Sequence, residues 1–387
     1  GIYCTGYNGF CRKTVVWSLH DLEVAMVILL FVAGLIFLIV GAEVLVRGSS
    51  RLATVFSISP LVIGLTVVAF GTSSPELAVS IKAALSDQAS IAVGNVIGSN
   101  IFNVLFILGL SALIVPLVVS HQLVRLDVPL MIALSVIVLV FALDNNFSRT
   151  EGLMLVAGLA IYIWFLIYQS RRPESAELKD EYARGPGIEG RDNNRWFKNI
   201  ALVIFGLALL VFGSRWLVDS SVSFAQYLGV SELIIGLTIV AVGTSLPEVV
   251  TSVIAAIRGE RDIAVGNVVG SNIFNIMGVL GFASIVAPAG IKVSAAVTRF
   301  DIPVMIAVAF ACLPIFFTGG VISRKEGVLL LGYYVAYTLY LALAAGHHDA
   351  LPRFSAVMLY FIIPLTVVTM IILAGREIRG RTKSRSE

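Results

Sequence analysis

Two glutamates, Glu76 and Glu248, stand in otherwise apolar sequence and are the side chains best suited to bind a ligand there. Each ends a similar motif, GTSSPE in the first case and GTSLPE in the second. Helical spacing puts Thr72 and Ser73 on the face of Glu76, and neither motif contains a Lys or Arg that could neutralise its carboxylate. A charged side chain at the centre of a bilayer costs about 2.5–3.5 kcal/mol even on the membrane-insertion scale, which gives lower values than simulations. We therefore expect both carboxylates to bind cations.

The prolines of these motifs predict a break in each helix. Pro75 has no N–H to donate to the Gly71 carbonyl, and its ring crowds that oxygen. A kink near 69–72 would free main-chain oxygens, which a membrane tolerates only where they line a cavity or meet a ligand. Carboxylates, hydroxyls and carbonyls are the ligands that hard cations such as Ca²⁺ and Na⁺ prefer. The expected set is Ala69, Thr72, Ser73 and Glu76, repeated as Ala241, Thr244, Ser245 and Glu248.

A second pair of motifs, GNVIGSNIFN and GNVVGSNIFN, carries a polar stripe. Its members stand four residues apart on one helix face: Asn95, Ser99 and Asn103 in the first motif, and Asn267, Ser271 and Asn275 in the second. These side chains could add neutral oxygens around the glutamates. The alternative is that they only form hydrogen bonds between helices.

Both motifs belong to a duplicated segment. Residues 61–110 and 233–282 align without a gap at an offset of 172, with 29 of 50 positions identical. The likeness continues downstream, where RLDVPLMIA matches RFDIPVMIA and SRTEG matches SRKEG. The repeated unit therefore contains about five membrane spans. Because five is odd, the second copy must enter the membrane from the opposite side, as in transporters built on inverted repeats.

Composition places the whole chain in a membrane. It is 58% hydrophobic and 13% charged, with a mean hydropathy of +0.95, and its net charge of +3 does not favour a nucleic-acid partner. We expect an all-α polytopic membrane protein made of two inverted five-helix repeats and one extra C-terminal transmembrane helix. The eleven predicted spans lie near 24–46, 53–84, 90–115, 126–143, 151–169, 199–217, 225–257, 263–287, 300–317, 327–345 and 354–375.

These spans divide the chain into segments. We expect a polar N-terminal segment (1–23), a first repeat (24–170), a cytoplasmic linker (171–198), a second repeat (199–346), and an eleventh helix with a basic cytoplasmic tail (347–387). With the N-terminus outside and the C-terminus in the cytoplasm, most of the 27 Lys and Arg residues fall on the inner side, as the positive-inside rule requires.

Several other polar residues have structural explanations. We expect an ion pair between Glu43 and Arg47, with Arg215 and Asp219 as the equivalent pair of the second repeat. Asp127 and Asp301 resemble caps at the start of a span, and the His347-His348-Asp349 run is typical of a solvated loop. Cys4 and Cys11 either pair or stay as free thiols in an N-terminal tail, while Cys312 fits core packing.

The two motif pairs together resemble the α-repeats of the cation/Ca²⁺ exchanger superfamily, specifically its Na⁺/Ca²⁺ antiporter branch. The resemblance covers essentially all ten core spans. It implies a secondary antiporter of the cell membrane, not an enzyme, that exchanges Na⁺ for Ca²⁺ electrogenically by alternating access. The ions and the bilayer are its only expected partners, with no cofactor and no obligate protein partner.

The resemblance also implies roles for the residues. Ca²⁺ would bind between Glu76 and Glu248 together with the carbonyls of Thr72 and Thr244. Na⁺ sites would be completed by Ala69, Ser73, Ser99, Ala241, Ser245 and Ser271, around a central position flanked by Asn103 and Asn275. Some relatives, including the K⁺-dependent branch, have Asp at one of these two Asn positions. The neutral pair here argues against K⁺ coupling.

Two other functions are compatible with parts of the sequence. The first is H⁺/Ca²⁺ exchange by the same glutamates. The motif of that branch resembles GNxxE, however, whereas this chain has Thr-Ser before each Glu. The second is an intramembrane hydrolase, which the sequence disfavours because no span holds a His placed to serve a Ser, nor a pair of Asp residues.

Overall fold

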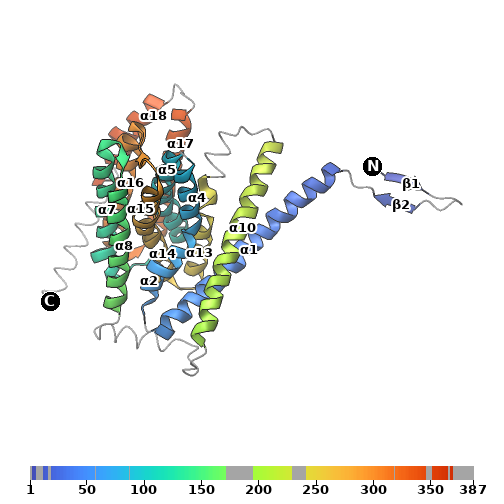
Figure 1. Ribbon diagram of the computed structural model, residues 1–387, viewed down its shortest axis with the longest axis horizontal. Helices are drawn as coiled ribbons and strands as arrows, with labels where there is room; N and C mark the ends of the chain where they lie inside the picture. The colour runs from blue at the N-terminus through green and yellow to red at the C-terminus, as the bar shows by residue number, and fades with distance from the viewer. Residues whose placement is uncertain are drawn as a thin grey trace.

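The computed structural model describes residues 2–5, 12–15, 19–56, 58–86, 88–170, 195–228, 241–317, 319–345, 351–364 and 367–368. These residues are nearly all helical, in one bundle flanked by a long oblique helix pair (Figure 1). The predicted all-α polytopic fold is confirmed. Most of the predicted linker, the His347-His348-Asp349 run, Cys11 and the end of the eleventh span lie outside the described residues.

The helices of the first repeat alternate regular α-helix with wider π-helical turns. They are α1 (Leu19–Phe56), α2 (Pro60–Ile63), η1 (Gly64–Val68), α3 (Ala69–Thr72), α4 (Ser74–Leu85), α5 (Ala89–Phe102), η2 (Asn103–Leu108), α6 (Gly109–Ile114), η3 (Leu123–Asp127), α7 (Val128–Phe141), the short 3₁₀ turn η4 (Ala142–Asp144) and α8 (Arg149–Ser170).

The second repeat follows the same order. Its helices are α10 (Arg195–Tyr227), α12 (Ala241–Gly243), α13 (Leu246–Ile257), α14 (Arg261–Phe274), η7 (Asn275–Leu280), α15 (Gly281–Val286), η8 (Val297–Asp301), α16 (Ile302–Phe317) and α17 (Arg324–Ala345). The extra C-terminal segment begins with α18 (Leu351–Val357) and η9 (Met358–Ile362).

Among the described residues, eight helices are long and apolar enough to cross a membrane, or nine with one bent pair counted as a span. The bent pair is Pro60–Thr72 with Ser74–Leu85, which meet at 46°. The second span was predicted to start near residue 53, and this was wrong because α1 continues to Phe56. Leu52 and Ala53 extend α1 beyond its apolar stretch because both are buried against the core.

Short strands tie the two repeats together. β3 (Leu117–Val118) pairs with β6 (Val321–Ile322), and β4 (Asn146–Phe147) pairs with β5 (Ile291–Lys292), both antiparallel. Each pair takes one strand from each repeat. The pseudo-two-fold axis that relates the repeats therefore maps one strand pair onto the other. A third strand pair, the hairpin of β1 (Ile2–Thr5) and β2 (Arg12–Val15), precedes α1.

Glycines bring helices of opposite repeats into backbone contact. In the pair formed by α1 and α10, a Cβ at Gly41 would lie 2.9 Å from the Gly206 carbonyl oxygen, and a Cβ at Gly34 would lie 2.9 Å from that of Gly213. Gly34 aligns with Gly206 and Gly41 with Gly213 at the offset of 172, so the two contacts are equivalent. Only glycine permits this approach.

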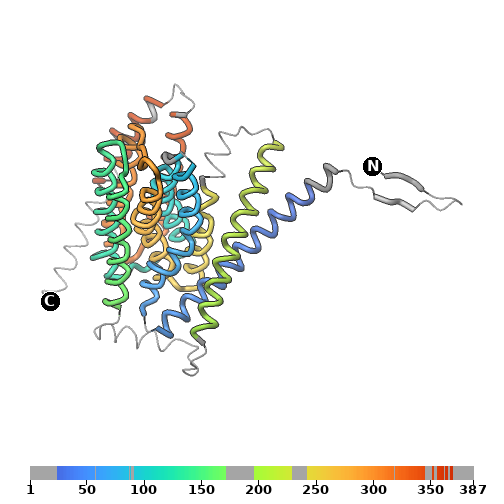
Figure 2. The backbone as a smooth tube through the Cα atoms, viewed as in Figure 1, coloured from blue at the N-terminus to red at the C-terminus, as the bar shows by residue number. Residues whose placement is uncertain are grey.

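The bundle places two helices at its centre. The span that starts with α14 is 89% buried, and the one that starts with α5 is 72% buried, whereas the α1 span is only 17% buried. Figure 2 shows the chain of the first repeat, in blue to green, interleaved with that of the second, in yellow to orange. The polar stripe of the sequence therefore lies in the interior, on α5 and α14.

Three smaller expectations have different outcomes. The ion pair between Glu43 and Arg47 is present. Among the residues that the structure describes, Arg215 and Asp219 form no such pair. Asp127 is no cap, because its helix begins earlier, and it accepts a hydrogen bond of 2.9 Å from the Tyr162 hydroxyl instead.

The equivalent residue of the second repeat behaves in the same way. Asp301 accepts a hydrogen bond of 3.0 Å from the hydroxyl of Tyr337. The aspartate of each repeat thus joins its own helix to the next one, α7 to α8 and α16 to α17. The expectation that Asp301 caps a span was therefore wrong as well.

Candidate cation site

The site is built where a span of each repeat breaks. The chain turns at Ser73, between α3 and α4, and at Ser245, between α12 and α13, with nearly the same backbone angles (φ −82°, ψ 8° and φ −90°, ψ 7°). The break near 69–72 that Pro75 predicted is confirmed in the first repeat, one residue later. In the described chain no backbone N–H bonds to the carbonyl of Thr72 or Thr244. Both carbonyl oxygens are free of backbone hydrogen bonds.

Crossed hydrogen bonds join the two glutamates to the opposite repeat. The Ser73 hydroxyl donates to Oε1 of Glu248 and the Ser245 hydroxyl donates to Oε1 of Glu76, each at 2.9 Å. Both glutamates are 1% exposed. The second carboxylate oxygen of each, Oε2, is buried and has no hydrogen-bond partner. The arrangement thus brings the two predicted acids together and leaves one oxygen of each available.

Among the described residues, no Lys or Arg forms an ion pair with either glutamate. The two ion pairs found among the described residues both belong to Glu43, which lies outside the site. A buried charge without a partner is strongly unfavourable. The described part of the chain also contains no cluster of three or more His, Cys, Asp or Glu side chains that could hold a metal. Two carboxylates surrounded by neutral oxygens are suited to a hard cation that must bind and leave.

The outer residue of each polar stripe holds the helices in place. The Asn95 amide donates to the Glu76 carbonyl at 3.2 Å and to the Ser80 hydroxyl at 3.0 Å. Asn267 repeats this pattern with the Glu248 carbonyl at 3.5 Å and the Ser252 hydroxyl at 2.9 Å. For these two asparagines the structure shows the interhelical hydrogen bonding that the sequence left as an alternative.

The remaining stripe residues present buried oxygens to the interior. Ser99, Ser271, Asn103 and Asn275 are at most 5% exposed. The Ser271 hydroxyl and the Oδ1 atoms of both asparagines have no hydrogen-bond partner. Ser99 differs from Ser271, because its hydroxyl accepts a bond of 3.3 Å from Ser245. Buried polar atoms without partners are rare in folded proteins.

The threonines and alanines differ between the repeats. The Thr72 hydroxyl donates to Asn267 Oδ1 at 3.1 Å and to the Ala69 carbonyl at 3.4 Å. The Ala69 carbonyl also accepts the Ser73 N–H at 3.0 Å, so a cation there would compete with protein donors. The Thr244 hydroxyl is buried without a partner. Ala241 opens α12, and its side chain lies outside the described part of the structure.

Two asparagines that the sequence did not single out join the repeats at the centre. Asn100 and Asn272 each donate to the other's main-chain carbonyl at 3.3 Å. Their Oδ1 atoms accept the amides of Asn275 at 3.1 Å and Asn103 at 3.0 Å, respectively. This ladder orients Asn103 and Asn275, which also open the π-helical turns η2 and η7. The signal was present, because both ladder residues belong to the repeated GSNIFN sequence.

We expect Asn100→Ala and Asn272→Ala to lower the thermal unfolding midpoint in detergent. Asn100→Ala takes the acceptor from the buried amide of Asn275, and Asn272→Ala takes it from that of Asn103. Each change also removes an amide that bonds to a main-chain carbonyl of the opposite repeat. A buried donor without a partner costs about 1–3 kcal/mol. Ser135→Ala is the control, since the buried Ser135 hydroxyl donates only within its own helix, to Met131. Equal midpoints for ladder and control variants would show that the ladder does not hold the repeats together.

The comparisons with known proteins agree with one another. The family model described as sodium/calcium exchanger protein matches residues 26–168 and 198–343, which are the two repeats. The sodium/calcium exchanger MaX1 of Methanosarcina acetivorans is 36% identical over 81% of this chain and 97% of its own length. The putative antiporter CaxA of Alkalimonas amylolytica is 40% identical over 79% of this chain and 95% of its own. The inner membrane protein YrbG of Escherichia coli is 36% identical over 80% of this chain and 94% of its own length.

A solved structure shares the fold as well. The sodium-calcium exchanger NCX_Mj, soaked with 10 mM Na⁺ and no Ca²⁺, superposes with a TM-score of 0.69 at 31% identity. The superposition covers 81% of this chain and 97% of that one. Proteins of this family are membrane-embedded secondary transporters rather than enzymes. By its two matched repeats and its fold, this chain belongs to the sodium/calcium exchanger family of antiporters.

Proposed function

We propose that the protein exchanges Na⁺ for Ca²⁺, with Ca²⁺ bound between Glu76 and Glu248. The observation that carries the proposal is the pair of buried Oε2 atoms without a hydrogen-bond partner, one from each repeat. The carbonyls of Thr72 and Thr244, free of backbone bonds, complete an all-oxygen set. Ca²⁺ favours six to eight such ligands, including carboxylates and carbonyls.

Na⁺ would occupy the same region in place of Ca²⁺. Its ligands would be the oxygens of Ser73, Ser99, Ser245 and Ser271 and the carbonyls of Ala69 and Ala241. The two carboxylates carry two negative charges, which one Ca²⁺ neutralises or several Na⁺ ions share. Because occupation by one species excludes the other, the two fluxes are coupled. Exchange of more than two Na⁺ for one Ca²⁺ would make transport electrogenic.

K⁺ takes no part in the proposed cycle. The central position is flanked by Asn103 and Asn275, which carry no charge. Their unpartnered Oδ1 atoms supply dipoles but no additional negative charge for a further monovalent cation. We place the protein in the cell membrane with its N-terminus outside and its C-terminus in the cytoplasm, since this orientation puts most Lys and Arg residues inside.

Alternating access would come from sliding of the α1–α10 pair along the bundle. Close glycine contacts bind the two helices to each other, and Figure 1 shows them crossing the bundle obliquely. Two polar contacts hold the C-terminal part of α1 to the bundle. Arg258 pairs with both carboxylate oxygens of Glu43, at 2.7 and 2.8 Å, and the Ser50 hydroxyl donates to Glu260 at 2.7 Å.

These four residues, Glu43, Ser50, Arg258 and Glu260, form what we call the latch. At the offset of 172, Glu43 corresponds to Arg215. The partners Arg258 and Glu260 correspond to Ser86 and Gln88, which carry no charge. Among the described residues, the second repeat forms no equivalent ion pair. We infer that the latch stabilises the state in which the end of α1 is closed against the bundle.

A Na⁺ gradient should drive Ca²⁺ uptake into proteoliposomes, and a K⁺ or H⁺ gradient should not. The physical reason is the oxygen set without a third acidic residue at the centre. The measurement is uptake of radioactive Ca²⁺ under each gradient separately, with protein-free vesicles as the control. Comparable uptake under a pH gradient alone would favour H⁺/Ca²⁺ exchange and overturn the proposal.

Glu76→Gln and Glu248→Gln should each abolish Ca²⁺ transport in protein that remains folded in the membrane. Either change leaves a single carboxylate to balance a doubly charged ion. Glu151→Gln is the matched control, because Glu151 accepts the Ser148 N–H at the start of α8, away from the site. Uptake near the normal rate in either site variant would exclude a site shared by the two repeats.

Glu43→Gln and Arg258→Gln should loosen the latch. The ion pair is partly exposed and worth about 0.2–1 kcal/mol, so we expect its loss to shift the equilibrium between access states by about 1.4-fold to fivefold. Hydrogen exchange at the end of α1 and at residues 258–260 should become faster. Arg47→Gln is the control, because it removes only the partner within α1. Equal acceleration in the control would mean that the bridge between elements is not what holds α1.

A further inference from the structure

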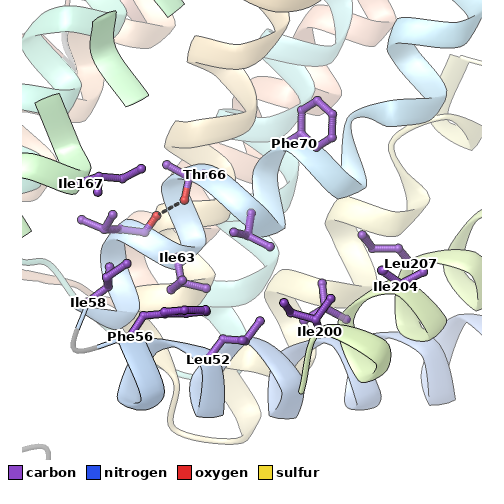
Figure 3. A pocket seen from close by; sticks show the side chains of 13 residues that line it. Leu52, Phe56, Ile58, Ile63, Thr66, Phe70, Ile167, Ile200, Ile204 and Leu207 are labelled. Carbon is purple, nitrogen blue, oxygen red and sulfur yellow. Dashed lines mark hydrogen bonds between the residues drawn. The ribbon is translucent and has the colours of Figure 1, made fainter. Parts of the chain in front are cut away.

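An apolar pocket separates the α1–α10 pair from the bundle. Its volume is about 420 Å³, and Figure 3 shows its walls. Leu52 and Phe56 come from the end of α1, Ile200 and Ile204 from the start of α10, and Ile167 from the end of α8. The helix that leads to the Glu76 break closes the remaining side, from Val62 to Phe70.

The pocket has no free polar group in its wall. Thr66 is the one lining residue with a polar side chain, and its hydroxyl donates to the Val62 carbonyl at 2.6 Å. Leu52 and Val62 are at most 4% exposed and form the deep part, whereas Phe70 and Ile204 are 54% and 62% exposed and form the rim. A pocket of this kind accepts hydrocarbon and offers nothing to a polar ligand.

Two basic residues are neighbours in sequence of residues that line the pocket. Arg51 immediately precedes the lining residue Leu52, and Lys198 comes two residues before the lining residue Ile200. Both are exposed, and neither forms an ion pair in the described part of the chain. Trp196, also exposed, is a residue type enriched at the membrane interface. Two exposed basic residues and an interfacial residue type thus occur on the two helix ends, of α1 and α10, that contribute to the pocket wall.

We propose that this pocket binds one acyl chain of an anionic phospholipid, with the lipid phosphate held at Arg51 and Lys198. The hydrocarbon matches the apolar wall, and the headgroup charge matches the two basic residues. The lipid belongs to the leaflet in which α1 ends and α10 begins. A neutral lipid would fill the same wall but would gain nothing from the two basic residues.

The position of the pocket gives the lipid a role in gating. The pocket lies between the α1–α10 pair, which we propose to slide, and the helix that leads to the break at Ser73. A chain seated there keeps these two bodies apart at their present spacing and must shift or leave when they slide. The gating role of the lipid rests on the proposed function, whereas lipid binding itself does not.

The experiment uses the full chain in vesicles containing phosphatidylglycerol with a photoreactive group in its acyl chain. After illumination, mass spectrometry locates the cross-links, which we expect on the ends of α1 and α10. Ile204→Trp, which places a large ring at the rim, should reduce them to background. Phe205→Trp is the matched control, because Phe205 is 56% exposed on the same helix but does not line the pocket.

A second arm tests the headgroup. The same probe on phosphatidylcholine should label the pocket less than the phosphatidylglycerol probe. Arg51→Gln and Lys198→Gln should each lower phosphatidylglycerol labelling about fivefold, since a basic residue near an anionic surface contributes about that factor. Equal labelling by both lipids would overturn the anionic preference. Cross-links spread evenly over the lipid-facing helices, or unchanged in Ile204→Trp, would overturn the site.

Transport distinguishes this inference from the proposed function. If Ile204→Trp loses the cross-link and alters the rate of Na⁺-driven Ca²⁺ uptake, while Phe205→Trp does neither, then both parts stand. If uptake fails to depend on Na⁺ in the unmodified protein, the proposed function fails and the lipid site is still decided by its cross-links. An unchanged uptake rate in Ile204→Trp would overturn the gating role alone.

Discussion

The burial of two carboxylates without a basic partner is the constraint on which the rest of the structure depends. Glu76 and Glu248 each have one oxygen held by a serine of the opposite repeat and one oxygen without a partner. A protein that placed an Arg here would be more stable on its own but would have no need of an ion. In the proposed function, a bound cation supplies the missing positive charge, and binding of one cation excludes the others.

Neither repeat can build this arrangement alone. Each supplies a carboxylate and a serine, but Ser73 completes Glu248 and Ser245 completes Glu76, so the two half-sites must face each other. The inverted duplication provides this geometry. The strand pairs between the repeats and the asparagine ladder hold the two repeats in this arrangement. The two repeats differ within the proposed cation site. The Thr72 hydroxyl forms a hydrogen bond, whereas the Thr244 hydroxyl has no hydrogen-bond partner. Such a difference makes the two halves of the site unequal ligands.

The sequence was sufficient for the fold class, the break at Pro75 and the meeting of the two acids, because apolar length, a missing N–H and an exact offset are local signals. It did not predict the ladder of Asn100 and Asn272, since spacing along a helix tells which face a residue occupies but not which helix lies opposite. Asp127 was mistaken for a cap for a related reason. Its helix is already formed at Leu123, before the start near 126 that the apolar run suggests, and the carboxylate lies within reach of Tyr162.

The α1–α10 pair is suited to move because it is held more firmly to itself than to the bundle. Within the pair, glycines bring backbones so close that no Cβ fits, and a slip between the two helices would separate these contacts. Toward the bundle, the described contacts include an apolar pocket and a partly exposed latch at one end. Apolar surfaces in a membrane lose little when they slide, because lipid replaces what protein leaves. In the cycle that we propose, the pair therefore moves as one body, with the lipid and the latch setting its resting position.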